Sequence, residues 1–268
     1  MPEDSLERAH SAARNGDLPG AAEALRRYLE ATPGDAPAHF QLAHLMLELE
    51  DAAAAVQSFE RASELAPDNA VVHNDLGTAL EVVGREPEAA QAYGRAARTS
   101  PPYPPAQYNL ALILCRQGQW HEAVQWLRAA LEQAPDFRVA RLQLGVALAA
   151  LDQVDAARAC FDDLLTADPK DMEARRALAD MHMRHCRFAD AARQLEQCLE
   201  LAPDDARGTL ALGACMQELG RLDEALAHYR RLLQREPCRY YEVVKKLTGA
   251  SKGRFWVKSA ELRRVLLG

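Results

Sequence analysis

The sequence predicts an all-α protein in which seven tandem helix hairpins stack into a solenoid. Three observations support this prediction: a regular spacing of proline, the same spacing of alanine and leucine, and a composition that favours helix. The chain has 268 residues, of which 49% are hydrophobic, 26% charged and only 6% aromatic. Alanine and leucine dominate and β-branched residues are sparse, which favours helices over a sheet.

Proline marks the repeat most clearly, because one proline follows another at intervals of 34 residues. The seven are Pro33, Pro67, Pro101, Pro135, Pro169, Pro203 and Pro237. Average proline usage is about 5%, so seven in one phase are not a coincidence. Alanine keeps the same interval from Ala21 to Ala225, and leucine keeps it from Leu42 to Leu212. Self-similarity at a fixed period indicates a stack of small, identical structural units.

With each of these prolines placed at position 32, the chain divides into seven repeats and a C-terminal remainder. The repeats are 2–35, 36–69, 70–103, 104–137, 138–171, 172–205 and 206–239, and the remainder is 240–268. In the third repeat, Asn69 is a suitable N-cap for a first helix over 71–83. Gly84 supplies the left-handed turn, and Pro87 begins the second helix. The proline at position 32 then ends the second helix, so each repeat is predicted to be a helix hairpin.

Small and bulky residues alternate in a way that explains how the hairpins pack. Positions 8 and 20 are small, which lets the two helices of a hairpin approach closely. Position 24 is bulky throughout, and its residues are Leu25, Phe59, Tyr93, Leu127, Phe161, Leu195 and Tyr229. A single hairpin leaves this apolar face exposed, so neighbouring repeats must stack to bury it.

Together these positions resemble the tetratricopeptide repeat family. The pattern is Leu-Gly or Leu-Ala at positions 7 and 8, Ala at 20, an aromatic residue or Leu at 24, and Pro at 32, and it covers 2–239. The first repeat departs from it with Arg8 in place of leucine, and we interpret that repeat as a solvated cap. The resemblance implies a right-handed superhelix whose first helices line a concave groove. It also implies a scaffold or adaptor for diverse partners, rather than one specific activity.

The helical period of about 100° per residue predicts which side chains face this groove. Positions 4, 7, 8 and 11 should pack, whereas positions 2, 6, 9 and 13 should face outward. Position 6 reads Glu7, Gln41, Asp75, Asn109 and Gln143, followed by Ala177 and Ala211. Such a polar ladder could bind the backbone of an extended peptide. This row is similar to the asparagine ladder of O-linked N-acetylglucosamine transferases, although Asn109 is its only asparagine. The alternative interpretation is that these polar side chains are simply solvated on an exposed face.

The predicted groove changes character along the chain. Repeats 1–3 are acidic, with two histidines at position 9, whereas repeats 6 and 7 mix both charges. Apolar residues line the middle, namely Tyr108, Leu112, Cys115, Val139, Leu142, Val146 and Ala149. The candidate peptide-binding residues are Glu7, His10, Gln41, His44, Asp75, Tyr108, Asn109, Leu112, Gln143, Val146 and Arg176. We expect a protein or peptide partner with apolar and basic residues. Packing of Leu142 and Val146 between neighbouring helices is the alternative.

Other functional classes find little support in the sequence. There is no nucleotide-binding glycine loop, no HExxH motif and no serine nucleophile elbow, so we expect no enzyme and no cofactor. His182, His185 and Cys186 do not converge at helical spacing, so we expect no metal and treat His182 as a satisfied core histidine. The N-terminus lacks the apolar segment of a signal peptide and no stretch could span a membrane, which predicts a cytoplasmic protein.

The remaining segment, 239–268, carries eight basic residues against two acidic ones, a net charge of +6. Residues 240–247 predict a helix that covers repeat 7 with Tyr240, Tyr241, Val244 and Leu247 on one side. A second short helix follows, with Ser259 as its N-cap. The alternative is a basic arm that binds a membrane surface or nucleic acid beside Phe255 and Trp256.

Three functions therefore remain after the sequence analysis. The leading one is a peptide- or protein-binding scaffold that uses the concave groove. The second is an accessory subunit that recruits substrates to a separate enzyme, such as a glycosyltransferase. The third is association with membranes or nucleic acid through the basic tail, although we expect no nucleic-acid partner.

Overall fold

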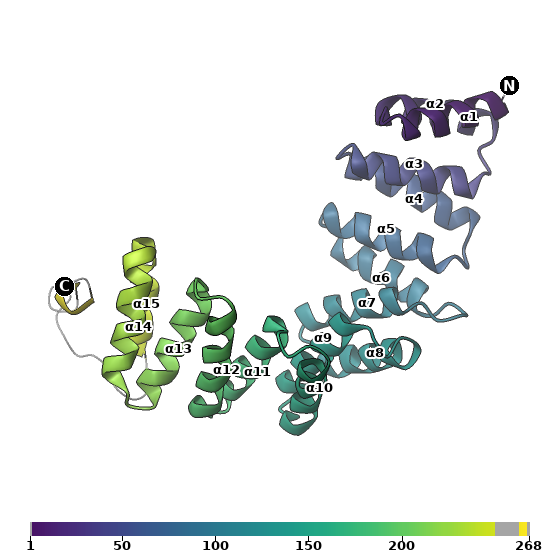
Figure 1. The fold of residues 1–268 in the computed structure, drawn as a ribbon. Coiled ribbons are helices and arrows are strands. Elements are labelled where there is room, and N and C mark those ends of the chain that lie inside the picture. Colours follow the sequence, from purple (N-terminus) through teal and green to yellow (C-terminus); the bar gives the residue numbers. More distant parts are fainter. Residues whose placement is uncertain (1, 250–262, 267–268) are drawn as a thin grey trace. The chain divides into compact units, whose positions relative to one another are not determined.

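The computed structural model describes residues 2–249 and 263–266, and within them every regular element is helical (Figure 1). The predicted all-α fold is confirmed. The first helices of the repeats are α1 (Pro2–Arg14), α3 (Ala36–Glu48), α5 (Ala70–Val82), α7 (Pro104–Arg116), α9 (Arg138–Ala150), α11 (Met172–Arg184) and α13 (Ala206–Glu218). The second helices are α2 (Leu18–Ala31), α4 (Ala52–Leu65), α6 (Glu86–Ala97), α8 (Trp120–Gln133), α10 (Val154–Ala167), α12 (Phe188–Leu201) and α14 (Leu222–Arg235). The chain forms two compact units, Met1–Ala140 and Arg141–Gly268, which are described separately.

The first helices α3, α5, α11 and α13 begin at Asp or Asn N-caps that follow the phased prolines, whereas α7 begins after Tyr103 without a side-chain cap. Asp35 accepts a hydrogen bond from the Ala38 backbone N–H at 2.9 Å, and Asp171 accepts one from Ala174 at 3.0 Å. Asn69 caps α5 in the same way, as predicted from the sequence. Each cap satisfies backbone N–H groups that have no partner inside the helix. The caps therefore explain why a proline and an Asp or Asn recur together at the repeat boundary.

The turn between the two helices has the same backbone conformation in all seven repeats. Four repeats place a glycine there, and its φ lies between 74° and 78°. The other three place Glu50, Asp152 or Cys186 at the equivalent position, with φ of 61°, 61° and 56°. A left-handed conformation costs a residue with a side chain about 1–2 kcal/mol. The turn is nevertheless kept, which indicates that the packing of the two helices imposes it.

The close approach of the two helices depends on the small residue at position 8. A Cβ atom added to Gly145 would lie 2.5 Å from the ring of Phe161 at position 24. Gly213 and Tyr229 meet in the same way, again at 2.5 Å. Phe161 and Tyr229 are completely buried at these contacts. Three of the four repeats with an aromatic ring at position 24 have glycine at position 8, whereas the second repeat pairs Ala43 with Phe59.

We predict a strong energetic coupling between Gly145 and Phe161. Gly145→Ala alone should lower the free energy of unfolding by about 1–3 kcal/mol, because the core is already close-packed. In a Phe161→Leu background the same change should cost little, because Ala with Leu is the pair that repeats 4 and 6 use. Urea unfolding of the two single variants and the double variant measures the coupling, expected at about 0.5–3 kcal/mol. Additive effects would contradict this packing model.

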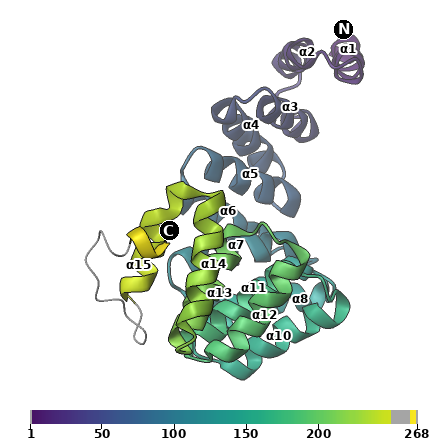
Figure 2. The same ribbon diagram turned by 60° about the vertical axis from the view of Figure 1, so that its left-hand side comes forward.

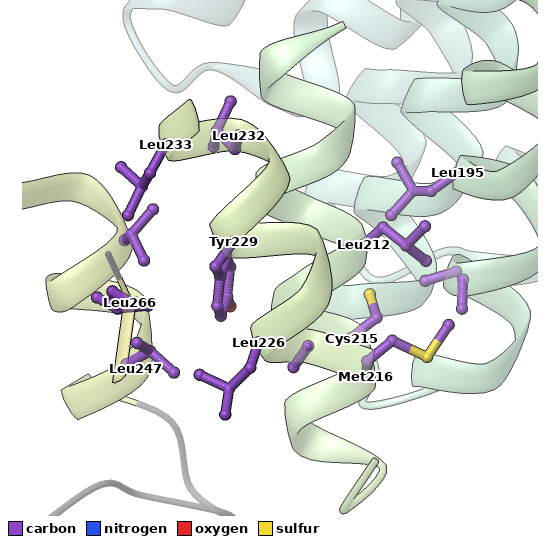
Figure 3. Packing of buried hydrophobic residues seen from close by; sticks show 14 of the residues in the cluster. Leu195, Leu212, Cys215, Met216, Leu226, Tyr229, Leu232, Leu233, Leu247 and Leu266 are labelled. Atoms are coloured by element: carbon purple, nitrogen blue, oxygen red, sulfur yellow. The ribbon is translucent and has the colours of Figure 1, made fainter. Parts of the chain in front are cut away.

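The C-terminal helix α15 (Tyr240–Gly249) follows the 3₁₀ turn η1 (Pro237–Arg239) and lies beside α13 and α14 (Figure 2). Val243 and Leu247 are fully buried in an apolar cluster that includes Tyr229 and Leu266 (Figure 3). The Gln217 side-chain amide donates a hydrogen bond to the Leu247 carbonyl oxygen at 2.9 Å. This helix therefore shares the apolar core of repeat 7.

One predicted detail of this helix is wrong. Tyr241, expected on the packed side, is 84% exposed, and Val243 takes its place in the core. The reason is that Val243 and Leu247, four residues apart, lie on the same face of the helix, and this face packs into the cluster. Tyr241 lies on a different face, which is open to solvent. The predictions for Ser259, Phe255 and Trp256 lie outside the described residues.

We predict that α15 stabilises the end of the solenoid. Leu247→Ala should lower the free energy of unfolding of the Arg141–Gly268 unit by about 2–5 kcal/mol, because it leaves a cavity in the cluster. Hydrogen exchange should accelerate first in α13 and α14, since repeats are stabilised mainly by their neighbours. The matched control is Tyr241→Ala, which removes an exposed side chain of the same helix and should change stability by less than about 0.5 kcal/mol. Equal effects of the two variants would show that α15 does not act as a cap.

Candidate binding groove

The outward face of the first helices follows the predicted periodicity. In α3, Gln41 and His44 are exposed, whereas Leu42, Ala43 and Met46 are buried. Positions 7, 8 and 11 therefore pack as predicted, and positions 6 and 9 are open to solvent. The prediction for position 4 is wrong, because His39 is only half-buried and Ala38 at position 3 is buried instead. This arrangement presents the polar ladder on one face of each first helix.

Within the Met1–Ala140 unit, the ladder side chains bind one another across neighbouring repeats. His10 Nε2 lies 3.3 Å from Gln41 Oε1, which links α1 to α3. His44 Nε2 lies 3.1 Å from Asp75 Oδ2, which links α3 to α5 in the same way. Both contacts join position 9 of one repeat to position 6 of the next. The two histidines at position 9 are thus the partners of the ladder residues Gln41 and Asp75. Glu7 at the start of the row is exposed.

Asn74 is a ladder residue that the sequence analysis missed. The Asn109 amide donates a hydrogen bond to Asn74 Oδ1 at 3.0 Å, and the Asn74 amide donates one to Asp75 Oδ1 at 3.1 Å. Asn74 is buried. The available signal was a polar residue at position 5, where most other repeats carry an apolar one. A peptide that binds the Asn109 amide would therefore have to replace an existing hydrogen bond.

The apolar residues predicted in the middle of the groove do not share one environment. The Tyr108 ring lies 5.3 Å from the Phe137 ring, and Leu112 is half-buried. Cys115 and Ala149 are buried, so their prediction as groove residues is wrong. Both occupy position 12, one helical turn after the small residue at position 8, and in α7 and α9 this position is packed.

The Arg141–Gly268 unit contains a hollow of about 760 Å³ on the side of its first helices. We call it the arginine hollow. Its lining is Val146, Phe161, Glu173, Arg176, Ala177, Asp180, Met183, Arg184, Arg207 and Lys246. Ala177 stands at position 6, where the earlier repeats carry a polar ladder residue. The short side chain leaves the space that Gln41 or Asn109 would fill. Gln143, the last polar residue of the predicted ladder, is half-buried.

A second hollow, of about 540 Å³, adjoins the first, and Met183 and Lys246 line both. We call it the apolar hollow. Its lining is Met183, Phe188, Leu210, Ala214, Cys215, Glu218, Glu242, Lys245, Lys246 and Gly249. Burial raises the pKa of the Cys215 thiol to about 11, so at neutral pH it is an uncharged, apolar part of the wall. Together the two hollows form a groove that crosses α9, α11, α13 and α15.

The basic side chains of the arginine hollow differ in how they are compensated. The Arg176 guanidinium donates a hydrogen bond to Asp205 Oδ2 at 2.8 Å, and Asp205 also caps α13. Arg207 Nη2 is 3.9 Å from Asp180 Oδ2, and both side chains are largely exposed. Arg184 and Lys246 have no ion-pair partner among the described residues. Arg176, predicted as a site residue, thus lines the hollow but is held by Asp205. Lys246 was missed because the C-terminal segment was treated as separate from the repeats.

The residues of the possible metal cluster remain apart. His182 is buried, Cys186 is exposed in the turn, and His185 Nδ1 lies 3.5 Å from Asp152 Oδ1. Among the described residues, no three His, Cys, Asp or Glu side chains are arranged to hold a metal ion. His182 is a core residue as predicted, but its Nδ1 has no hydrogen-bond partner in the described part of the chain. The expectation of a satisfied histidine is therefore wrong for this atom.

We predict that His182 makes the fold less stable in acid. Burial lowers the pKa of His182, so the folded chain binds a proton there less readily than the unfolded chain does. Stability should therefore fall as pH drops below about 6.5, the ordinary histidine pKa, because protonation favours the unfolded state. In His182→Met, which places the residue of Met46 and Met216 at this position, less stability should be lost between pH 7.5 and 5.5. Urea unfolding at the two pH values tests this, and an unchanged loss would exclude His182 as a source.

The comparisons with known proteins agree with this architecture. A model of the tetratricopeptide repeat (TPR) family matches residues 12–80, 83–143, 116–181 and 183–247. These segments extend over most of the sequence, and the chain belongs to this family. No curated protein matches the sequence significantly. No helix among the described residues combines the length and apolar character needed to cross a membrane.

Several solved structures share the fold at low sequence identity. YrrB, described as a TPR protein with an unusual peptide-binding site, is 23% identical, covers 70% of this chain and 97% of its own, and has a TM-score of 0.62. The type IV pilus biogenesis factor PilW is 21% identical, covers 79% and 97%, and has a TM-score of 0.67. The C-terminal part of a TPR protein from Cytophaga hutchinsonii is 17% identical, covers 90% and 99%, and has a TM-score of 0.71. These similarities establish the fold alone.

Proposed function

We propose that this protein is a non-catalytic scaffold that binds a segment of another protein in the groove of its Arg141–Gly268 unit. The observation that supports this proposal is the open arginine hollow of about 760 Å³, where Ala177 replaces the polar ladder residue. In the described ladder of the other unit, the equivalent side chains of Gln41, Asp75 and Asn109 already bind their neighbours. In the Arg141–Gly268 unit, by contrast, the arginine hollow combines free space with two basic side chains, Arg184 and Lys246, that form no ion pair with the described residues.

The shape of the groove favours an extended segment over a small molecule. Two adjoining hollows cross four helices and share Met183 and Lys246. Their walls combine apolar side chains with charged ones, as protein interfaces do. A peptide in extended conformation can place alternate side chains in the two hollows. The family as a whole serves as a protein-interaction scaffold, and YrrB is described as having a peptide-binding site.

For the Met1–Ala140 unit we propose a supporting role through the outward edge of its ladder. Exposed carboxylates such as Glu7 and Glu48 would favour basic residues of the partner, and Tyr108 and Leu112 would contact apolar ones. The side chains of this surface already form hydrogen bonds between repeats. We therefore place the main binding energy in the Arg141–Gly268 unit.

We predict that filling the groove abolishes partner binding. Ala177→Arg combined with Ala214→Arg places two long side chains into the two hollows without removing a core residue. Partners captured by the wild-type protein from a native lysate should be lost by this variant, because the space they occupy is filled. Affinity capture with mass spectrometry provides the measurement, and circular dichroism verifies that the variant remains folded.

The matched control is Ala189→Arg with Ala227→Arg, which adds the same charge to exposed positions of α12 and α14. It should retain every partner that the wild-type protein captures. If the groove variant and the control retain the same partners, binding does not occur in this groove and the proposal fails.

A further inference from the structure

We infer that the Arg141–Gly268 unit carries a second binding site, a polar hollow beside His182 that takes a small zwitterion such as a free α-amino acid. The hollow lies between α10, α11 and α12 and has a volume of about 160 Å³. We call it the histidine hollow. Its polar lining residues are Arg158, Asp162, His182, Asp190, Arg193 and Gln194, and Leu178 completes the lining. None of these residues lines the arginine hollow or the apolar hollow, so the site is separate from the groove of the proposed function.

His182 occupies a position that is apolar in the neighbouring repeats. It stands at position 11 of repeat 6, where repeats 2–5 and 7 have the buried residues Met46, Leu80, Leu114, Leu148 and Met216. The His182 side chain is only 6% exposed, and its Nδ1 has no hydrogen-bond partner in the described part of the chain. A buried polar atom without a partner destabilises the fold. Packing alone would favour leucine or methionine here, which indicates that the imidazole serves a ligand.

Arg158 is a second departure from the repeat, and it lies at the same place. Position 21 is Ala, Val or Leu in the six other repeats, namely Ala22, Val56, Ala90, Val124, Ala192 and Leu226. In repeat 5 it is Arg158, whose side chain is 56% exposed. Arg158 and His182 belong to neighbouring repeats, yet both line the histidine hollow. Two polar residues at positions that otherwise pack therefore meet in one hollow.

The equivalent place between repeats 1 and 2 has neither departure. The hollow there is wider, about 510 Å³, and Met46 lines it at position 11. Arg26 Nη2 lies 3.2 Å from Met46 Sδ, and position 21 carries the buried Ala22. A polar hollow with a buried imidazole is thus a property of repeats 5 and 6 and does not follow from the repeat itself.

The charges of the histidine hollow cancel. Arg158 Nε lies 3.2 Å from Asp162 Oδ2 on the same helix, and Arg193 forms an ion pair with Asp190 on the next second helix. Burial lowers the pKa of His182, so its ring is neutral at pH 7.5. An occupant with a net charge would bring that charge into the hollow without a counter-charge, which is unfavourable away from bulk water. The occupant should therefore carry no net charge.

The lining favours separated charges over a neutral polar molecule. Exposed ion pairs within one helix contribute little to stability, so a ligand can replace them. A ligand carboxylate bound by one of the arginines, and a ligand ammonium bound by one of the aspartates, form charge-assisted hydrogen bonds. Such bonds are stronger than those a neutral molecule would make. Gln194 and the His182 ring can bind a polar side chain of the ligand. These requirements describe a small α-amino acid.

The test uses the full-length chain and small probes of known charge. L-alanine, L-serine and L-asparagine are zwitterions, whereas acetate is an anion, methylammonium a cation and glycerol a neutral polar molecule. Proton–nitrogen correlation spectra of nitrogen-15-labelled protein follow each titration at pH 7.5. We expect saturable shifts of the His182 ring nitrogens and of backbone amides in α10, α11 and α12. At least one amino acid should bind about tenfold or more tightly than acetate, methylammonium and glycerol, because only a zwitterion uses both kinds of charged group.

Two substitutions that restore residues of other repeats locate the site. His182→Met and Arg158→Val introduce the residues of Met46 and Val56, so both variants should remain folded, which circular dichroism verifies. Each should weaken binding of the amino acid by about tenfold or more. The matched control is Arg27→Val. Like Arg158, Arg27 is exposed and pairs within its own second helix, but it lies outside the histidine hollow, so the affinity should not change.

The unfavourable outcomes are distinct. Tighter binding of acetate or methylammonium would show that the hollow selects a net charge, and equal binding of glycerol would show that it needs no charge; either result would overturn the zwitterion. If none of the three amino acids produced saturable shifts, there would be no such site. An affinity that His182→Met and Arg158→Val leave unchanged would place the amino acid elsewhere on the chain. None of these results bears on the groove, which the capture experiment with Ala177→Arg and Ala214→Arg tests separately.

Discussion

The close approach of the two helices within each hairpin is the contact on which the rest of this structure depends. A small residue at position 8 allows the side chain at position 24 to fill the gap, and opposite the rings of Phe161 and Tyr229 that residue is glycine. A Cβ at Gly145 would lie only 2.5 Å from its aromatic partner, which real packing does not tolerate. Because this contact is repeated along the chain, each hairpin presents the same apolar face to its neighbour, and the stack buries what one hairpin would expose.

The same packing explains local features that would otherwise be unfavourable. Glu50, Asp152 and Cys186 adopt a left-handed backbone at the turn, as glycine does in the other repeats. Their strain of about 1–2 kcal/mol each is offset by the burial that the correctly placed second helix makes possible. The packing also determines the outward face of the first helices, since positions 3, 7, 8 and 11 are buried in helices such as α3 and α11. Only the remaining positions can serve a partner.

Those remaining positions have two different uses in the two units. In the Met1–Ala140 unit, the polar side chains at position 6 bind residues of the preceding repeat, as the pair His44 and Asp75 shows. In the Arg141–Gly268 unit, Ala177 ends this pattern and the arginine hollow opens. A change from a polar side chain to alanine thus converts a self-contained surface into a groove. Lys245 and Lys246 of α15 line the continuation of this groove.

The sequence by itself determined the all-α class, the 34-residue period and the outward face of each first helix, because these follow from the helical repeat and from residues such as Gly84 and Pro87 that act locally. The tertiary structure decided which outward side chains meet. Asn109 reaches Asn74 and Gln41 reaches His10 across 35 and 31 residues, and these contacts depend on how each hairpin is rotated against the next. Periodicity predicts direction but not that rotation. For the same reason, only the packing of Val243 and Leu247 showed that α15 shares the core of repeat 7 and brings Lys246 to the groove.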